Sequence, residues 1–291
     1  QAWMALDEHF YDGNFHGVDW KAIREKYAKM VDGTLVPGDF NIVVQRMIGE
    51  LNASHLGCYG GGISGPETGL LGLDYDESYE GPGVKVIGRL YNGPCTKAGS
   101  EVAAGEYILQ INGKDVQFGE SLFDALKGMV GKRVKLTVNA KPEAEGARTI
   151  SVKPIGGGEW ANLRYEQWVR DNRNRVLELS GGRLYYLHIR SMDGASLERF
   201  RRDLFGEAQR YEGLVIDVRY NGGGRIHDDL LEELTKKVHV YENQRNAPAV
   251  TQPIRQYDKP KVLIINEHCA SDSEIFPNGF REKKLGKIVG V

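Results

Sequence analysis

The pattern of apolar and polar positions changes its period twice along the chain. Near the N-terminus, Trp3, Leu6 and Phe10 recur at the spacing of one helix face. Two further stretches, reaching to residue 52, repeat this period, and Asp39 is placed to cap the third helix. The pattern therefore predicts an N-terminal helical segment over residues 1–62.

Short strand-like runs punctuated by glycine and proline follow, over residues 68–155, with one helical stretch, ESLFDALKGM, among them. The run GEYILQING, preceded by an Ala-Gly pair, resembles the centre of a PDZ domain, with Glu106 in place of the usual Asp. PDZ domains bind extended peptide ends along a sheet edge, and loop amides receive the terminal carboxylate. The resemblance implies that Gly69, Leu70 and Gly72 belong to this loop. The alternative is a domain that acts only as a spacer.

Residues 160–291 alternate buried strands with amphipathic helices. GLVIDVRYN and KVLIIN are nearly continuous apolar runs, as expected of parallel strands covered on both faces. A short polar helix is expected after GGGEW, and crossover helices between the strands. The predicted fold class is α+β and multidomain: a helical segment, a PDZ-like β domain and an α/β core of the crotonase-like ββα kind.

Composition excludes several partners. The net charge of −2 provides no basic field for nucleic acid, and no apolar run has the ~20 residues of a membrane helix. The three cysteines, Cys58, Cys95 and Cys269, are odd in number and widely spaced, which predicts neither a disulfide framework nor zinc. The seven histidines are scattered, so no metal and no cofactor are expected.

Two stretches could carry chemistry. NEHCASDSEIFP follows an apolar strand and places Ser271 and Asp272 where a helix should begin. Ser271 is interpreted either as a helix cap or as a nucleophile, since a helix N-terminus stabilises a developing oxyanion. VIDVRYNGGGR ends a buried strand in successive glycines, whose N–H groups could stabilise an oxyanion or bind phosphate. No G-K-[ST] follows, so a nucleotide site is disfavoured.

These parts together resemble the tail-specific protease and tricorn family of serine peptidases. The family order is a helical segment, a PDZ domain, and a core with D-x-R-x-N-x-G-G followed by S-x-S-E-I. The chain has DVRYNGGG from Asp217 and SDSEI from Ser271, in that order. Tail-specific proteases use a Ser–Lys dyad, whereas tricorn-type enzymes use a histidine from a Ser-His pair. Ser54 and His55 occupy the place of that pair, which favours the tricorn type.

The resemblance implies roles for individual residues. Ser271 would be the nucleophile and His55 its general base, with Ser54 bridging to a carboxylate that orients the imidazole. The N–H groups of Asp272 and of Gly223 or Gly224 would form the oxyanion hole. Ser273 and Glu274 would support the turn.

The third catalytic group has no match. The family places it well downstream of the nucleophile, and only 20 residues follow Ser271 (291 − 271). With Gln1 at its start and an unfinished strand at its end, the chain is interpreted as a fragment of a longer enzyme. Asp258 and especially Glu242 could line a pocket for basic side chains, although a solvated loop is the favoured interpretation because Asp and Glu are common on surfaces.

The expected partners are peptides or unfolded protein segments, and the resemblance implies a hexameric homo-oligomer. A cytoplasmic location is favoured over a periplasmic one. Two alternatives remain: a non-catalytic PDZ-type peptide-binding scaffold on a degenerate peptidase fold, and a crotonase-type acyl-CoA enzyme. The latter family lacks an inserted PDZ domain.

Overall fold

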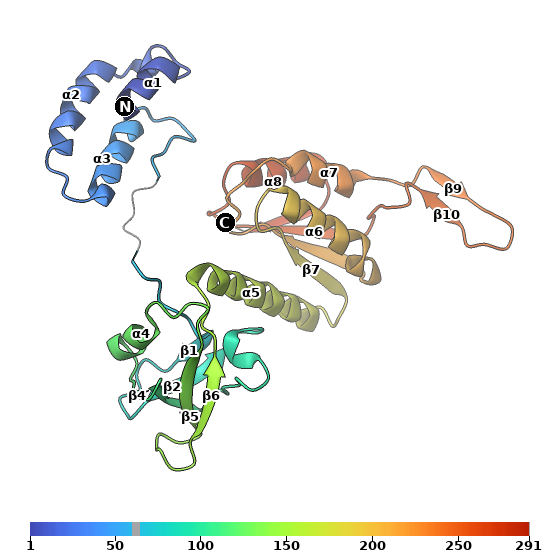
Figure 1. Ribbon diagram of the computed structural model, residues 1–291. Helices are drawn as coiled ribbons and strands as arrows, with labels where there is room; N and C mark the ends of the chain where they lie inside the picture. The colour runs from blue at the N-terminus through green and yellow to red at the C-terminus, as the bar shows by residue number, and fades with distance from the viewer. Residues whose placement is uncertain (60–64, 291) are drawn as a thin grey trace.

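The computed structural model describes residues 1–59 and 65–290, and these form three units with separate hydrophobic cores. Figure 1 shows the helical unit (blue) standing apart from the other two, and the long helix α5 running between the PDZ-like unit and the α/β unit. The chain is therefore an α+β multidomain protein, as predicted.

The N-terminal unit contains three helices around a core that includes Trp20, Tyr27 and Leu51. The carboxylate of Asp19 caps the second helix by accepting from the Ala22 N–H at 3.0 Å. The predicted cap at Asp39 is wrong, because the third helix begins two residues earlier, at a proline whose fixed φ suits the first helical position. The helices are α1 (Ala2–His9), α2 (Trp20–Val31) and α3 (Pro37–Gly49), with a 3-10 turn η1 (Phe15–Gly17).

The PDZ-like unit is an antiparallel sheet with strand order β1-β2-β3-β5-β6 and β4 paired to β3. Strand β6 was not predicted, because its exposed polar positions hide the alternation. Strand β1 lies at the edge of the sheet. The elements are β1 (Leu73–Tyr75), β2 (Val84–Arg89), η2 (Pro94–Thr96), β3 (Tyr107–Ile111), β4 (Lys114–Asp115), α4 (Glu120–Leu126), β5 (Val134–Asn139) and β6 (Arg148–Val152).

Helix α5 (Gly157–Leu179) has 23 residues, so the expectation of a short helix is wrong. Its sequence is polar on most positions, which conceals the length from a hydrophobic pattern. Val169 and neighbouring apolar residues of α5 pack against Tyr186 and Val215 on one face of the α/β sheet.

The α/β unit is a parallel sheet in the order β7-β8-β11-β12. Helices α6, α7 and α8 contribute to the core on its other face, so β8 is buried along its whole length. Its elements are β7 (Leu184–His188), α6 (Gly194–Phe205), η3 (Glu207–Arg210), β8 (Gly213–Asp217), α7 (His227–Thr235), β11 (Lys261–Ile265), α8 (Asp272–Glu282) and β12 (Lys287–Gly290).

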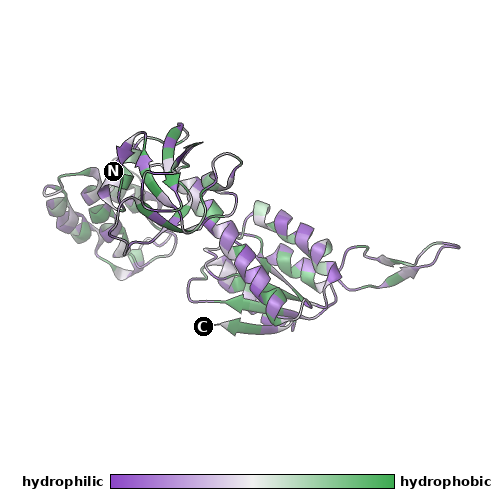
Figure 2. Ribbon diagram, turned by 90° about the horizontal axis from the view of Figure 1, so that it is seen from below, coloured by the Kyte–Doolittle hydropathy of each residue, from purple (hydrophilic) through white to green (hydrophobic). Residues whose placement is uncertain are grey.

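An unpredicted hairpin of β9 (Val240–Glu242) and β10 (Val250–Gln252) interrupts the path from α7 to β11. It extends away from the body of the α/β unit (Figures 1 and 2). In contrast, the carboxyl ends of the parallel strands β7, β8 and β11 meet at one edge of the sheet, and both chemical motifs of the sequence follow them there.

Candidate active site

Ser271 lies between β11 and α8 in a backbone conformation that is rare for a residue with a side chain. Its φ is 55° and its ψ is −121°, and its N–H donates to the Glu274 carboxylate at 2.6 Å. A strained backbone of this kind persists only where its surroundings enforce it, and such positions cluster at functional sites. The side chain is half-buried, at the point where α8 begins.

The second serine of the motif is structural. Ser273 is fully buried, and its hydroxyl donates to the Asn221 carbonyl oxygen at 2.5 Å and accepts from the Ala270 N–H at 2.9 Å. Asn221 is also buried, and its side chain donates to the Ile189 carbonyl oxygen at 2.9 Å. These bonds join the ends of β7, β8 and β11 into one frame beneath Ser271.

The glycine loop packs directly against this turn. Gly223 and Gly224 have φ values of +96° and +150°, which residues with a side chain rarely adopt. A methyl group on Gly224 would lie 1.9 Å from the Met192 carbonyl oxygen. The glycines are therefore required by both conformation and close approach.

Two of the predicted oxyanion donors are free within the described residues. The Gly223 N–H is already used, because it donates to the Asn221 side-chain oxygen at 2.8 Å. The N–H groups of Gly224 and Asp272 donate to no partner among residues 1–59 and 65–290. Of the two glycines predicted, Gly224 is thus the one that can serve an oxyanion in this arrangement.

A buried carboxylate shapes the start of the glycine loop. Asp217 accepts from the Tyr186 hydroxyl at 2.7 Å and from the Arg219 guanidinium at 2.6 Å. Burial, together with this carboxylate, raises the pKa of the Tyr186 hydroxyl, and the ion pair raises the pKa of Arg219. The Arg219 carbonyl oxygen accepts from His188 Nε2 at 2.9 Å, and burial lowers the pKa of His188. The D-x-R part of the motif therefore acts by fixing backbone.

Sequence reasoning missed the role of the Asp272 side chain and missed His227 entirely. The buried Asp272 carboxylate accepts from the backbone N–H groups of Ile226 and His227, and from the His227 imidazole. An acid directly after the proposed nucleophile was a visible signal, but its partner lies 45 residues earlier in the chain.

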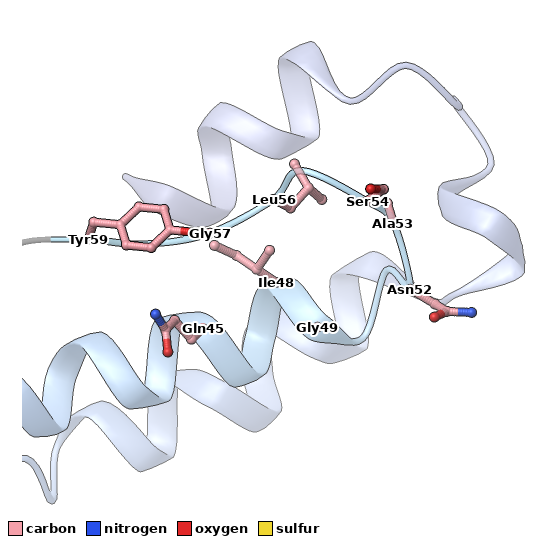
Figure 3. Close-up of a pocket in the computed structure, with 9 residues that line it drawn as sticks. All are labelled: Gln45, Ile48, Gly49, Asn52, Ala53, Ser54, Leu56, Gly57 and Tyr59. Carbon is pink, nitrogen blue, oxygen red and sulfur yellow. The ribbon is translucent and has the colours of Figure 1, made fainter. Parts of the chain in front are cut away.

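His55 follows α3 in the helical unit, whereas Ser271 precedes α8 in the α/β unit. His55 and Ser54 are exposed on the turn after α3, where Asn52 and His55 both have positive φ. Figure 3 shows Ser54 beside a pocket of about 490 Å³ in the helical unit. No hydrogen bond or ion pair links His55 to the α/β unit within the described residues. The pairing of His55 with Ser271 stays a prediction.

The predicted substrate-binding residues lie in two places. The amides of Gly69 and Leu70 are already paired, donating to the carbonyl oxygens of Leu126 and Ile155 at 2.8 Å. Gly72, directly before β1, has a φ of +69°. Glu242 lies on the exposed hairpin and accepts from the Gln252 side chain. Binding by these residues stays a prediction.

The described residues contain no cluster of three or more His, Cys, Asp or Glu side chains arranged to hold a metal ion. None of the described helices is long and apolar enough to cross a membrane.

The chain is similar to known proteins along all three of its units. The description "Tricorn protease C1 domain" matches residues 1–49, "Tricorn protease PDZ domain" residues 69–157, and "Peptidase family S41" residues 183–291. The tricorn protease of Thermoplasma volcanium is 27% identical over 100% of this chain and 28% of its own length. Tricorn protease homolog 1 of Streptomyces coelicolor is 32% identical over 98% of this chain and 27% of its own length.

A solved structure is similar to the chain over the same three units. "Crystal structure of the tricorn protease" superimposes with a TM-score of 0.77 at 26% identity, over 100% of this chain and 29% of that one. A serine at a strand-to-helix turn, a facing glycine loop and a PDZ-like unit define the class, a serine-type peptidase fold with a PDZ domain. The chain belongs to the tricorn-type branch of peptidase family S41. It spans between about a quarter and a third of the length of these relatives.

Proposed function

We propose that the chain is the nucleophile-bearing part of a tricorn-type serine peptidase that hydrolyses peptides or unfolded protein segments. One observation carries the proposal: Ser271 is held in a strained turn against Gly223, and the nearby amides of Gly224 and Asp272 have no partner in the part of the chain that the structure describes. Attack by Ser271 Oγ on a peptide carbonyl would create an oxyanion, and two preorganised N–H donors stabilise such a charge.

His55 is the proposed general base, with Ser54 beside it. A serine hydroxyl does not attack unaided, so a base must reach it through a hydrogen bond. Support comes from the tricorn relatives, whose similarity covers 100% and 98% of this chain and so includes both the helical unit and the α/β unit. The proposal requires the helical unit to dock at the sheet edge that carries Ser271.

The PDZ-like unit is proposed to bind an extended part of the substrate. Strand β1 lies at the edge of its sheet, where a peptide could add as a further strand. Helix α5 follows the PDZ-like unit in the chain and packs on one face of the α/β sheet, whose strand β11 precedes Ser271. A peptide bound to the PDZ-like unit would therefore be tethered near the site.

Self-association is proposed through the β9–β10 hairpin. A two-stranded hairpin is marginally stable alone, and this one exposes Val240, Tyr241 and Val250. A second copy of the chain is the proposed occupant of this surface, in keeping with a homo-oligomer.

Labelling with a fluorophosphonate probe, followed by intact-mass analysis, tests the nucleophile. It would be applied to this chain and to the full-length product of its gene, as wild type, Ser271→Ala and His55→Ala. The expected result is one probe on the wild-type full-length protein and none on either variant. Probe on another residue, or none on the full-length wild type, would overturn the proposal.

The second candidate function is a non-catalytic peptide-binding scaffold. The helical unit, with α3 just before His55, stands apart from the α/β unit (Figure 1), which favours it. It predicts that the full-length protein binds peptides through the PDZ-like unit and leaves the probe unreacted. Probe uptake that depends on both Ser271 and His55 would eliminate it.

A further inference from the structure

The residue after the proposed nucleophile has a side chain that reaches into a different element. The Asp272 side chain accepts from the Ile226 N–H at 2.8 Å and the His227 N–H at 3.1 Å, and from His227 Nδ1. Asp272 itself is 3% exposed. Its carboxylate therefore caps helix α7, although Asp272 is the first residue of helix α8.

His227 completes this contact from the start of α7. Its imidazole is partly buried, with Nδ1 on Asp272 and Nε2 at 3.4 Å from the Asp228 carboxylate. The hydrogen bond from Nδ1 to the buried Asp272 carboxylate orients the ring, whereas the Asp228 carboxylate is exposed. Bonds of an ionised carboxylate to N–H donors are stronger than neutral ones.

The opposite side of the glycine loop is fixed independently. The Met192 N–H donates to the Gly223 carbonyl oxygen at 3.0 Å, and the Arg225 N–H donates to the Met192 carbonyl oxygen at 2.8 Å. The peptide that carries the Gly224 N–H thus lies between an anchor at Met192 and an anchor at Asp272.

We propose that the Asp272–His227 pair is a clamp that positions both oxyanion donors. The Asp272 main chain supplies one N–H, and its side chain holds the segment that follows the other, at Gly224. His227 is a positioning residue: it acts through Asp272 and contacts no reacting atom. This proposal rests on the proposed peptidase function of Ser271.

The clamp affects the rate because an N–H group stabilises the oxyanion only when it is within hydrogen-bond distance of it. Removal of one donor lowers the rate by ~100- to 1000-fold, and a misplacement of ~1 Å can have an effect of ~100-fold. Loss of the imidazole leaves the backbone bonds to Asp272 in place, so the expected effect of His227→Ala is smaller, about 10-fold. It should fall on kcat and leave KM unchanged, since substrate binding uses other contacts.

The test compares three variants of the full-length gene product. His227→Ala removes the clamp, His227→Asn keeps an N–H donor near the position of Nδ1, and His9→Ala removes an exposed histidine elsewhere. Labelling of Ser271 by a fluorophosphonate and hydrolysis of a fluorogenic peptide are the activity readouts. The expected result is an approximately 10-fold loss in kcat and labelling rate for His227→Ala, recovery to within about threefold for His227→Asn, and no change for His9→Ala.

A purely structural role for His227 would lower stability without this kcat-selective loss and its recovery. Wild-type rates in His227→Ala would overturn the clamp. If the wild type itself shows no labelling at Ser271, the proposed function fails, and the clamp is judged by NMR on the ¹⁵N-labelled chain. The Gly224 and Asp272 amide resonances should then shift in His227→Ala and stay in place in His9→Ala. Unmoved resonances would again overturn the clamp.

Discussion

Gly223 packs so closely on Ser271 that a methyl group added to the glycine would lie 2.8 Å from the Ser271 Cβ. The same methyl group would lie 2.7 Å from the Ala270 carbonyl oxygen and 3.0 Å from the Asp272 nitrogen. The glycine loop and the nucleophile turn, 48 residues apart (271 − 223), are thus a single packed unit, in which a change in one must move the other.

Gly223→Ala is expected to destabilise the α/β unit and to suppress labelling of Ser271. The φ of +96° alone disfavours alanine by about 1–2 kcal/mol, and the overlap with backbone atoms adds to this. Because the turn must shift to admit the methyl group, labelling should fall by ~100-fold. Thermal unfolding and intact-mass labelling measure the two effects.

Gly222→Ala is the matched control. A Cβ at this position meets nothing within 4 Å, and the backbone is outside the left-handed region. Stability and labelling should stay near wild type. Equal effects at the two positions would mean that the contact between Gly223 and Ser271 is unimportant.

Ser271→Gly is expected to stabilise the chain while abolishing labelling. The φ of 55° is unfavourable for serine by about 1–3 kcal/mol, and glycine adopts it freely. Glycine also makes the unfolded chain more flexible, which costs about 0.5–1 kcal/mol of folding free energy. When this cost is subtracted, the free energy of unfolding should still rise by about 1 kcal/mol. The midpoint of thermal unfolding reports the gain.

Ser273→Gly should behave in the opposite way. Loss of its buried hydroxyl removes the bonds to Asn221 and Ala270, which destabilises by about 1–3 kcal/mol, while Ser271 still reacts with the probe. A gain in stability from the change at Ser273, or a loss from the change at Ser271, would reverse the roles given to the two serines.

Much of the α/β unit could be predicted because its strands are buried along their length. Every residue of GLVID in β8 is buried, and its sequence is apolar up to Asp217, as expected of a parallel strand covered on both faces. The positions of Ser271 and Gly223 beyond the carboxyl ends of two strands were also predictable, since each lies in a short motif that follows such a strand. Each of these two motifs consists of residues that are adjacent in the sequence, so it is visible without knowledge of the fold.

Features that depend on distant parts of the chain could not be read in this way. Helix α5 is covered on one face only, and its polar sequence hid 23 residues of helix. The contact between Asp272 and His227 joins the starts of two helices, and no periodic pattern in the sequence indicates it. The pairing of His55 with Ser271 depends on docking between units, which neither pattern nor motif determines.

His188→Gln is expected to make the α/β unit less sensitive to acid. Burial lowers the pKa of His188 and so favours the neutral imidazole in the fold, where Nε2 donates to the Arg219 carbonyl oxygen. Below about pH 6.5 the unfolded chain gains a proton that the folded chain excludes, so stability falls as the pH decreases. Glutamine keeps the donor and does not titrate.

The measurement is the thermal midpoint at pH 7.5 and pH 5, for wild type, His188→Gln and an exposed control, His9→Gln. The decrease between the two pH values should be smaller in His188→Gln than in the wild type, because glutamine takes up no proton on unfolding. His9→Gln should follow the wild type. An identical decrease in all three proteins would show that His188 is not the acid-sensitive group.

Tyr241→Ser and Val250→Ser, combined, are expected to weaken self-association without unfolding the α/β unit. Tyr241 is 71% exposed and Val250 42% exposed on a hairpin that shares no core with the rest of the unit. Burial of apolar side chains on such an arm against a second copy is favourable by roughly 25 cal/mol per Å².

Light scattering coupled to size-exclusion chromatography should show a smaller molar mass for the double variant at equal concentration. Leu179→Ser, at a 70% exposed residue at the end of α5, is the control and should leave the mass unchanged. If the wild type is itself monomeric at high micromolar concentration, or if the double variant keeps the wild-type mass, the hairpin does not mediate assembly.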